Sequence, residues 1–168
     1  MDIVTIFHQI AAGIPLCIRR QTDDDLPFSE AVYIAHRWEE IQAAPWTDEQ
    51  RLAFLRSQFQ GQWNHYASAY YDADFLILES EGQKIGRLYL HDQNPNDLRI
   101  IDIGLMPEWR ACGLGGVLLR TVMDYAQAQG KICSIHVEQS NPARHLYERL
   151  GFKEVKPVGP YFLLEWHP

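Results

Sequence analysis

Apolar positions recur at two different spacings along the chain, and the change of spacing separates helical from extended segments. From residue 47 to residue 70 they step by three or four, which is the period of a helix with one buried face. This stripe consists of Leu52, Leu55, Phe59, Trp63, Tyr66 and Tyr70. Thr47 and Gln50 have the spacing of a capping box, so the helix is expected to begin there. Beyond it, "ADFLILES" and "KIGRLYLH" alternate around Glu81-Gly82 and predict a β-hairpin.

The rest of the chain divides by the same criteria. Residues 23–41 predict a helix with Pro27 in its first turn, and a further helix runs to about Ala128, where Gly130 ends it. A short helix is expected at 141–150. The other predicted strands are "LCIRR" (16–20), "LRIIDIGLM" (98–106), "ICSIHVE" (132–138), "FKEV" (152–155) and "YFLLEW" (161–166). The order β-α-α-β-β-β-α-β-α-β-β predicts one mixed α+β domain over residues 1–168. We expect an antiparallel meander followed by a helical crossover into a parallel strand.

Composition and charge restrict the function classes. The 168 residues are 46% apolar and 22% charged, which is typical of one globular domain. A net charge of −7 argues against nucleic-acid binding and weakly favours a cationic ligand. Cys17, Cys112 and Cys133 form no CxxC, so we expect a reduced, cytoplasmic protein without disulfides or a metal site. The apolar start, "MDIVTIFHQIAAG", is too short to span a bilayer and lacks a basic region. We interpret it as a short ordered arm, with no membrane attachment.

The stretch "PEWRACGLGGVLL" (107–119) places three glycines between a predicted strand and an apolar helix. The first turn of a helix has unpartnered N–H groups and the positive end of the helix dipole. Without Cβ atoms at 113, 115 and 116, an anion such as a pyrophosphate can approach these donors, with Arg110 adding charge at the rim. Alternatively, the glycines only allow close helix–strand packing, or the loop binds another phosphate ligand. Neither a Walker A loop nor a dinucleotide fingerprint is present.

Two motifs together resemble a known family. Arg110-x-x-Gly113-x-Gly115 is similar to motif A of the GNAT superfamily of N-acetyltransferases, and "NPARHLYERLGF" (141–152) is similar to its motif B around Tyr147. The resemblance extends over roughly residues 16–166 and includes the order of the strands. It implies a GNAT-like acyl-CoA N-acyltransferase fold. That fold has a central mixed, mostly antiparallel sheet with a splayed parallel strand pair, flanked by helices.

The resemblance also implies a site for acetyl-CoA. Its arm would lie in a V-shaped cleft as a false strand, bonded to the backbone of Ile103 and Leu105, and Gly104 would permit a bulge there. The amides expected to hold the pyrophosphate belong to Cys112, Gly113, Leu114, Gly115, Gly116 and Val117. The family often has an asparagine seven residues before the motif B tyrosine, whereas Asn141 is six before Tyr147 and Ser140 is seven before it. Asn141 or Ser140 could contact the cofactor, or Asn141 could only cap a helix.

Tyr147 occupies the position of the family's general acid, which protonates the departing thiolate. It could instead be a packed tyrosine with a bonded hydroxyl. The amide of Leu105 is the expected oxyanion donor. For the general base we slightly favour His136 over Asp102, although each could be a paired sheet residue and a water relay could replace both. No nucleophile is well placed, since Cys112 lies in the pyrophosphate loop, so we expect direct attack in a ternary complex.

The second helix and the segment before it normally form the acceptor wall in this fold. Aromatic and acidic residues gather in and around this region: Trp46, Trp63, His65, Tyr66, Tyr70, Tyr71, Asp72 and Asp74. We expect Trp63, Tyr66 and Tyr70 to pack inward, and the candidate acceptor-binding residues are His65, Tyr66 and Asp72. Such a pocket suits a primary amine of a small molecule or peptide. The alternative is a non-catalytic acyl-CoA-binding sensor or scaffold of the same fold. A homodimer is a further possibility that the resemblance suggests.

Overall fold

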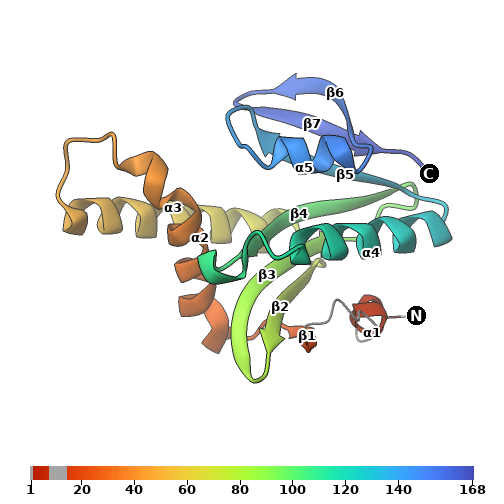
Figure 1. Ribbon diagram of the computed structural model, residues 1–168, viewed down its shortest axis with the longest axis horizontal. Helices are drawn as coiled ribbons and strands as arrows, with labels where there is room; N and C mark the ends of the chain where they lie inside the picture. The colour runs from red at the N-terminus through yellow and green to blue at the C-terminus, as the bar shows by residue number, and fades with distance from the viewer. Residues whose placement is uncertain (1, 8–14) are drawn as a thin grey trace.

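The computed structural model describes residues 2–7 and 15–168, in which a seven-stranded sheet carries helices on both faces (Figure 1). The helices are α1 (Ile3–Phe7), α2 (Leu26–Ile41), α3 (Asp48–Ala69), α4 (Leu114–Ala128) and α5 (Arg144–Arg149), with 3-10 turns at Asp23–Asp25 and Pro107–Trp109. The strands are β1 (Leu16–Arg20), β2 (Asp74–Ser80), β3 (Gln83–His91), β4 (Asp97–Leu105), β5 (Ile132–Glu138), β6 (Lys153–Val158) and β7 (Tyr161–Trp166). Helix α1 precedes the predicted order of elements, which is otherwise confirmed. The part of the predicted N-terminal arm at 8–13 lies outside the described residues.

The sheet has the order β1-β2-β3-β4-β5-β7-β6. Neighbouring strands are antiparallel except β4 and β5, which pair in parallel as predicted. The β2–β3 hairpin turns at Glu81 and Gly82, whose φ angles of 50° and 79° are both positive. A two-residue hairpin turn with this twist requires such angles, and glycine adopts them without strain. The α+β class with one parallel pair is therefore confirmed.

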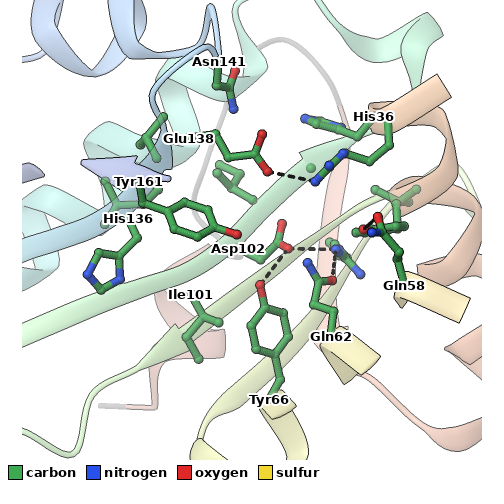
Figure 2. A pocket seen from close by; sticks show the side chains of 18 of the residues that line it. His36, Gln58, Gln62, Tyr66, Ile101, Asp102, His136, Glu138, Asn141 and Tyr161 are labelled. Carbon is green, nitrogen blue, oxygen red and sulfur yellow. Dashed lines mark hydrogen bonds and ion pairs between the residues drawn. The ribbon is translucent and has the colours of Figure 1, made fainter. Parts of the chain in front are cut away.

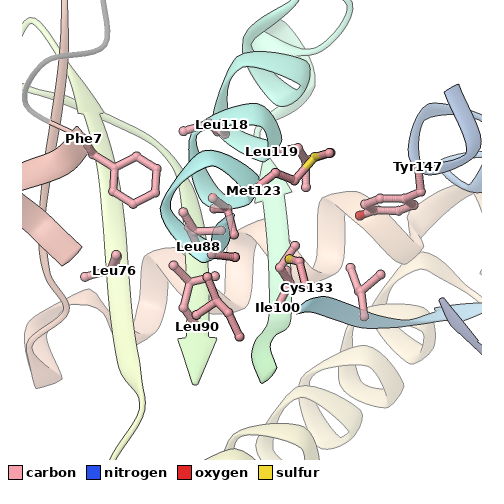
Figure 3. Close-up of a cluster of buried hydrophobic side chains, with 14 of the residues drawn as sticks. Phe7, Leu76, Leu88, Leu90, Ile100, Leu118, Leu119, Met123, Cys133 and Tyr147 are labelled. Carbon is pink, nitrogen blue, oxygen red and sulfur yellow. The ribbon is translucent and has the colours of Figure 1, made fainter. Parts of the chain in front are cut away.

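The main core lies between the sheet and helices α1, α4 and α5 (Figure 3). Helix α4 buries the face that its periodicity predicts: Leu118, Leu119, Val122, Met123 and Ala126. Burying one such leucine contributes about 1.5–3 kcal/mol, so this face fixes α4, and with it the glycine loop, against the sheet. Helices α2 and α3 pack together on the other face around a smaller cluster of Tyr33, Leu55 and Phe59.

Local signals in the sequence set several helix ends. Thr47 Oγ1 accepts a hydrogen bond from Gln50 N at 3.2 Å, and the Gln50 side chain accepts from Thr47 N at 2.9 Å. The predicted capping box is thus confirmed. Gly130, with φ of 68°, ends α4 as expected. No helix in the described part of the chain is both long and apolar enough to cross a membrane.

Candidate functional site

The parallel strands β4 and β5 pair over only four residues each, and the last pair is Ile100 with Ile135. Beyond this pair a cavity of about 700 Å³ opens between β4 and β5 on one side and α2 and α3 on the other (Figure 2). Tyr147 of α5 also lines it. The splayed strand pair that the family resemblance implies is therefore present, and the cavity lies where the two strands diverge.

The register of β4 against β3 decides where its backbone groups point. Gly104 is paired with Arg87, and Met106 N donates to Ile85 O at 2.8 Å. In an antiparallel ladder with this spacing, the N–H and C=O groups of Ile103 and Leu105 face away from β3. They face the side from which β5 has already diverged. These are the two residues whose backbone the sequence predicted to meet an extended ligand.

A β-bulge interrupts β4, but not where it was predicted. The register against β3 skips Ile101, whereas Gly104 is regularly paired, so the prediction of a bulge permitted by Gly104 was wrong. Gly104 is instead a point of close approach, because a Cβ there would lie 2.9 Å from Val32 Cγ1 of α2. The extra residue reorients the strand so that Asp102 faces α2 and α3.

The glycine loop is open at the start of α4. Gly113 has a φ of 82°, and a Cβ there would meet nothing within 4 Å in the described structure. At Gly115 it would touch only Leu146 at 3.8 Å, and at Gly116 only the guanidinium of Arg120, from 3.4 Å. Close helix–strand packing therefore does not explain these glycines. The first turn of α4 presents unpartnered N–H groups to open space, which suits an approaching anion.

Two residues of the predicted phosphate site differ from expectation. Val117 N donates to Gly113 O at 3.2 Å as the first hydrogen bond of α4, so this amide is not available to a ligand. The backbone amides that remain as candidate donors to the pyrophosphate are those of residues 112–116. Arg110 does not extend over the loop. Its Nε donates to Leu105 O at 3.0 Å and its Nη2 to His36 Nδ1 at 3.3 Å, so its charge lies between β4 and α2.

Tyr147 is a packed residue that also faces the cavity. The Tyr147 ring is buried in the main core (Figure 3). It packs edge-on against Phe152, with ring centroids 5.7 Å apart. It also lines the cavity. Burial raises the pKa of Tyr147 above its usual value, and the charge of Asp102 adds to this effect. The phenol therefore keeps its proton at neutral pH, which is the state that a proton donor requires.

Two of the carboxylates that line the cavity, Asp102 and Glu138, are paired with arginines of other elements. Asp102 Oδ2 accepts from Arg87 Nη2 at 2.7 Å and from the Tyr66 hydroxyl at 3.4 Å. Glu138 Oε1 accepts from Arg37 Nη1 at 2.8 Å, which links β5 to α2 across the cavity. Burial raises the pKa of Tyr66, with a further contribution from Asp102, so Tyr66 is a neutral hydrogen-bond donor. The predicted base Asp102 thus lies in the cavity, but one of its oxygens is already engaged.

Two histidines of the cavity, His136 and His36, are also paired with arginines. His136 Nδ1 accepts from Arg99 Nη1 at 2.7 Å, and burial together with the charge of Arg99 lowers its pKa. His36 Nδ1 accepts from Arg110, and burial together with the charge of Arg110 lowers the pKa of His36. Each neutral imidazole therefore directs its lone pair at a guanidinium. Figure 2 shows the His136 ring directed away from Asp102, so His136 is less suited to be the base than we predicted.

The predicted acceptor residues separate into two groups. His65 and Tyr66 line the cavity, whereas Asp72 lies outside its lining and pairs with His91 Nε2 at 2.8 Å. Helix α3 ends at Ala69, so Asp72 lies in the connection to β2 and not on the helix that lines the cavity. Trp63 packs inward against Phe75, as expected.

Asn141 lines the cavity, and its Oδ1 accepts from Ala143 N at 2.9 Å. This bond closes a turn ahead of α5, which begins at Arg144 with Ala143 as its N-cap and no side-chain cap, so the helix-capping alternative for Asn141 is not confirmed. Its side-chain nitrogen points toward the cavity in Figure 2. Ser140 is not part of the described lining.

Several lining residues were absent from the predicted site: Tyr33, His36, Arg37, Glu40, Gln58, Gln62, Arg87 and Tyr161. A signal for some of them exists in the sequence. Gln58, Gln62 and Tyr66 recur every four residues on α3, which places them on one face. Arg87 interrupts the otherwise apolar run "IGRLYL", and a charge in such a position needs a buried partner.

The sequence profile described as "Acetyltransferase (GNAT) family" matches residues 35–152. The chain belongs to this family. It is 30% identical over 121 residues to the mycothiol acetyltransferase of Corynebacterium glutamicum, covering 67% of this chain and 41% of that protein. It therefore spans about two fifths of the length of that relative. An N-alpha-acetyltransferase of Sulfurisphaera tokodaii is 27% identical over 106 residues, covering 55% of this chain and 64% of that one.

Solved structures of GNAT proteins share the fold. The PaiA N-acetyltransferase of Thermoplasma acidophilum, in complex with coenzyme A, has a TM-score of 0.68 at 21% identity over 91% of this chain and 99% of that one. A GNAT acetyltransferase of Elizabethkingia anophelis with acetyl-CoA bound has a TM-score of 0.59 at 16% identity, over 92% and 99%. The family and fold implied by the two sequence motifs are confirmed.

Proposed function

We propose that this GNAT chain transfers an acetyl group from acetyl-CoA to a primary amine of a small molecule or peptide, by direct attack in a ternary complex. The observation that carries the proposal is the splitting of β4 from β5 beyond Ile100 and Ile135. This split opens one cavity in which the outward-facing backbone of Ile103 lies opposite the polar residues of α2 and α3. Leu105 follows two positions later on the same side of β4, beyond the lining of the cavity.

The residues present fit coenzyme A. The amides of residues 112–116 are at the open start of α4, where added Cβ atoms would fill only free space or touch one side chain. Several charge-assisted bonds there, each worth about 1.5–3 kcal/mol, would hold the pyrophosphate. The backbone of Ile103 and the N–H of Leu105 would bond the extended arm as a neighbouring strand does, whereas Leu105 O already accepts from Arg110. Acetyl-CoA supplies the activated thioester, whose carbonyl carbon the amine attacks while the carbon–sulfur bond breaks.

Groups of this chain then stabilise the negative charge that develops on the carbonyl oxygen and transfer protons from the amine and to the sulfur. The Leu105 amide stabilises the oxyanion. The second oxygen of Asp102, directly or through a water, takes the proton that the ammonium must lose. The Tyr147 hydroxyl gives its proton to the departing sulfur, and the tyrosinate recovers a proton from the acylated nitrogen, which still carries one in excess. No cysteine need carry the acetyl group, because Cys112 Sγ lies in the phosphate loop and donates to Trp109 O at 2.9 Å.

A thiol-release assay tests the proposal. The purified chain is mixed with acetyl-CoA and a panel of primary amines, and free thiol is measured beside calorimetric titration of acetyl-CoA alone. Amine-dependent release supports transfer. Tight binding without release supports the sensor or scaffold alternative instead. Displacement of acetyl-CoA by ATP at comparable concentration, followed in a thermal-shift series, would point to a different phosphate ligand.

The substitution Tyr147→Phe tests the proposed role of Tyr147 as the general acid. We expect kcat to fall about tenfold, because a thiol with a reference pKa near 8.5 leaves only partly without protonation. The acetyl-CoA affinity should change less than about twofold, since the ring and its packing on Phe152 remain. Steady-state kinetics and calorimetry separate the two effects. An unchanged kcat would rule out Tyr147 as the acid.

A further inference from the structure

The acceptor side of the cavity is organised around one buried arginine. The Arg87 side chain is 3% exposed and rises from β3 beneath α2 and α3. Its Nη2 donates to Asp102 Oδ2 at 2.7 Å and to Gln62 Oε1 at 3.1 Å. Its Nη1 donates to Ser29 Oγ at 2.9 Å. A single guanidinium nitrogen thus brings the head groups of Asp102 and Gln62 side by side.

Arg87 also fixes which atoms of these two residues face the cavity. A guanidinium has donors only, so each partner must turn an acceptor toward it. The Gln62 amide therefore directs its oxygen inward to Arg87, and its NH₂ group toward the cavity. Asp102 uses Oδ2 for Arg87, and Figure 2 shows its other oxygen directed into the cavity. The cavity consequently presents a fixed donor next to a fixed, negatively charged acceptor.

We infer that the amine acceptor carries a hydroxyl or carbonyl oxygen on the carbon adjacent to its amine-bearing carbon. The ammonium group is held by the free oxygen of Asp102, and the neighbouring substrate oxygen accepts from the Gln62 NH₂ group. A 2-amino alcohol, a 2-amino sugar and an α-amino amide share this chemistry. The inference rests on the proposed transferase function and names the class of its acceptor.

The ammonium group of a simple alkylamine would bind the free oxygen of Asp102, but the alkylamine would cover the Gln62 NH₂ group without accepting a hydrogen bond from it. Leaving a donor unpaired in this way is penalised, which corresponds to about ten- to hundredfold discrimination. Gln62 is therefore a specificity-determining residue. Gln58 faces the same cavity, but its oxygen interacts with the Tyr33 hydroxyl at 3.3 Å, and a hydroxyl can donate or accept. The orientation of its amide is not fixed in the same way.

The test uses pairs of amines that differ in this oxygen: ethanolamine against n-propylamine, glucosamine against cyclohexylamine, and alaninamide against 2-aminobutane. kcat/KM is measured for each at saturating acetyl-CoA. We expect the oxygen-bearing member to be favoured about ten- to hundredfold in at least one pair. The pair with the largest ratio distinguishes an alcohol, sugar or peptide-like source. In addition, 3-aminopropanol should show no such advantage over n-butylamine, because its oxygen is one carbon further away.

Gln62→Glu is the decisive variant. Glutamate keeps an oxygen for Arg87 and the size of the side chain, but it replaces the donor with an acceptor. The preference within each pair should fall at least about tenfold in this variant. Gln60→Glu makes the same change on the exposed side of α3, where Gln60 bonds Asn64 at 3.0 Å, and should leave the ratios unchanged. Equal rates within every wild-type pair, or ratios that Gln62→Glu does not alter, would overturn the inference. Failure to release thiol with any amine would instead overturn the proposed transferase function.

Discussion

Gly115→Glu is expected to lower the affinity for acetyl-CoA by about a thousandfold, the equivalent of about 4 kcal/mol. The carboxylate would occupy the open space at the first turn of α4, where the amides of residues 112–116 are expected to bind the pyrophosphate. The substitution removes two or more charge-assisted bonds and adds repulsion between like charges. The fold should persist, because a Cβ at this position touches only Leu146, at an ordinary contact distance of 3.8 Å.

Gly61→Glu is the matched control for this experiment. Gly61 lies on α3, and a Cβ there meets no described atom within 4 Å, so the same charge is added away from the loop. Calorimetric titration of both variants with acetyl-CoA, beside their melting temperatures, gives the comparison. Retained affinity in Gly115→Glu, with Gly61→Glu also unaffected, would remove the pyrophosphate from the start of α4.

Much of the fold could be predicted because its signals are local. The capping box at Thr47 and Gln50, the two-residue turn at Glu81-Gly82 and the stop at Gly130 are each specified by neighbouring residues. The apolar face of α4 follows from a single periodicity. The backbone positions Ile103 and Leu105 came from the family resemblance and not from a local signal. The strand assignment adds only that its pleat turns both residues in the same direction.

The side chains of the site were harder to predict because their partners are distant in sequence. Asp102 pairs with Arg87 of the preceding strand, but Glu138 pairs with Arg37, which lies 101 residues earlier. Whether a histidine or carboxylate is free to act as a base depends on these contacts, and no local pattern reveals them. Asp72 shows the same limitation. It is close to the acceptor helix in sequence, yet it pairs with His91 outside the cavity lining.

The acidic run Asp23-Asp24-Asp25 illustrates how one position in a uniform pattern can differ from its neighbours. The sequence suggests a solvated start to a helix, and Asp23 and Asp24 are exposed. The Asp25 side chain is only 2% exposed. It accepts from Arg19 at 2.7 and 2.9 Å, from Lys84 Nζ at 2.7 Å and from Thr22 N at 2.8 Å. These bonds tie β1, β3 and the start of α2 together.

Asp25→Asn is therefore expected to lower the free energy of unfolding by about 3 kcal/mol at neutral pH, since it breaks a buried, hydrogen-bonded ion pair. Asparagine would also direct an NH₂ group at two cations. Asp24→Asn, at the adjacent exposed position, should change stability by less than about 0.5 kcal/mol. Urea denaturation of the three proteins gives these values. A loss in Asp25→Asn no larger than that in Asp24→Asn would contradict the role of this cluster.

The same contacts predict how this stabilisation depends on pH. The hydrogen bonds from Arg19, followed by those from Lys84 and Thr22, hold the pKa of Asp25 well below its usual value and outweigh the opposing effect of burial. The unfolded chain binds a proton at Asp25 near pH 3.9, at about the reference value, whereas the folded chain does not. The contribution of Asp25 is therefore complete above that pH and declines as the pH falls further. Measured in urea at pH 7 and again near pH 3, the difference between wild type and Asp25→Asn should shrink by about 1 kcal/mol. A constant difference would mean that Asp25 titrates alike in both states, which its four buried hydrogen bonds argue against.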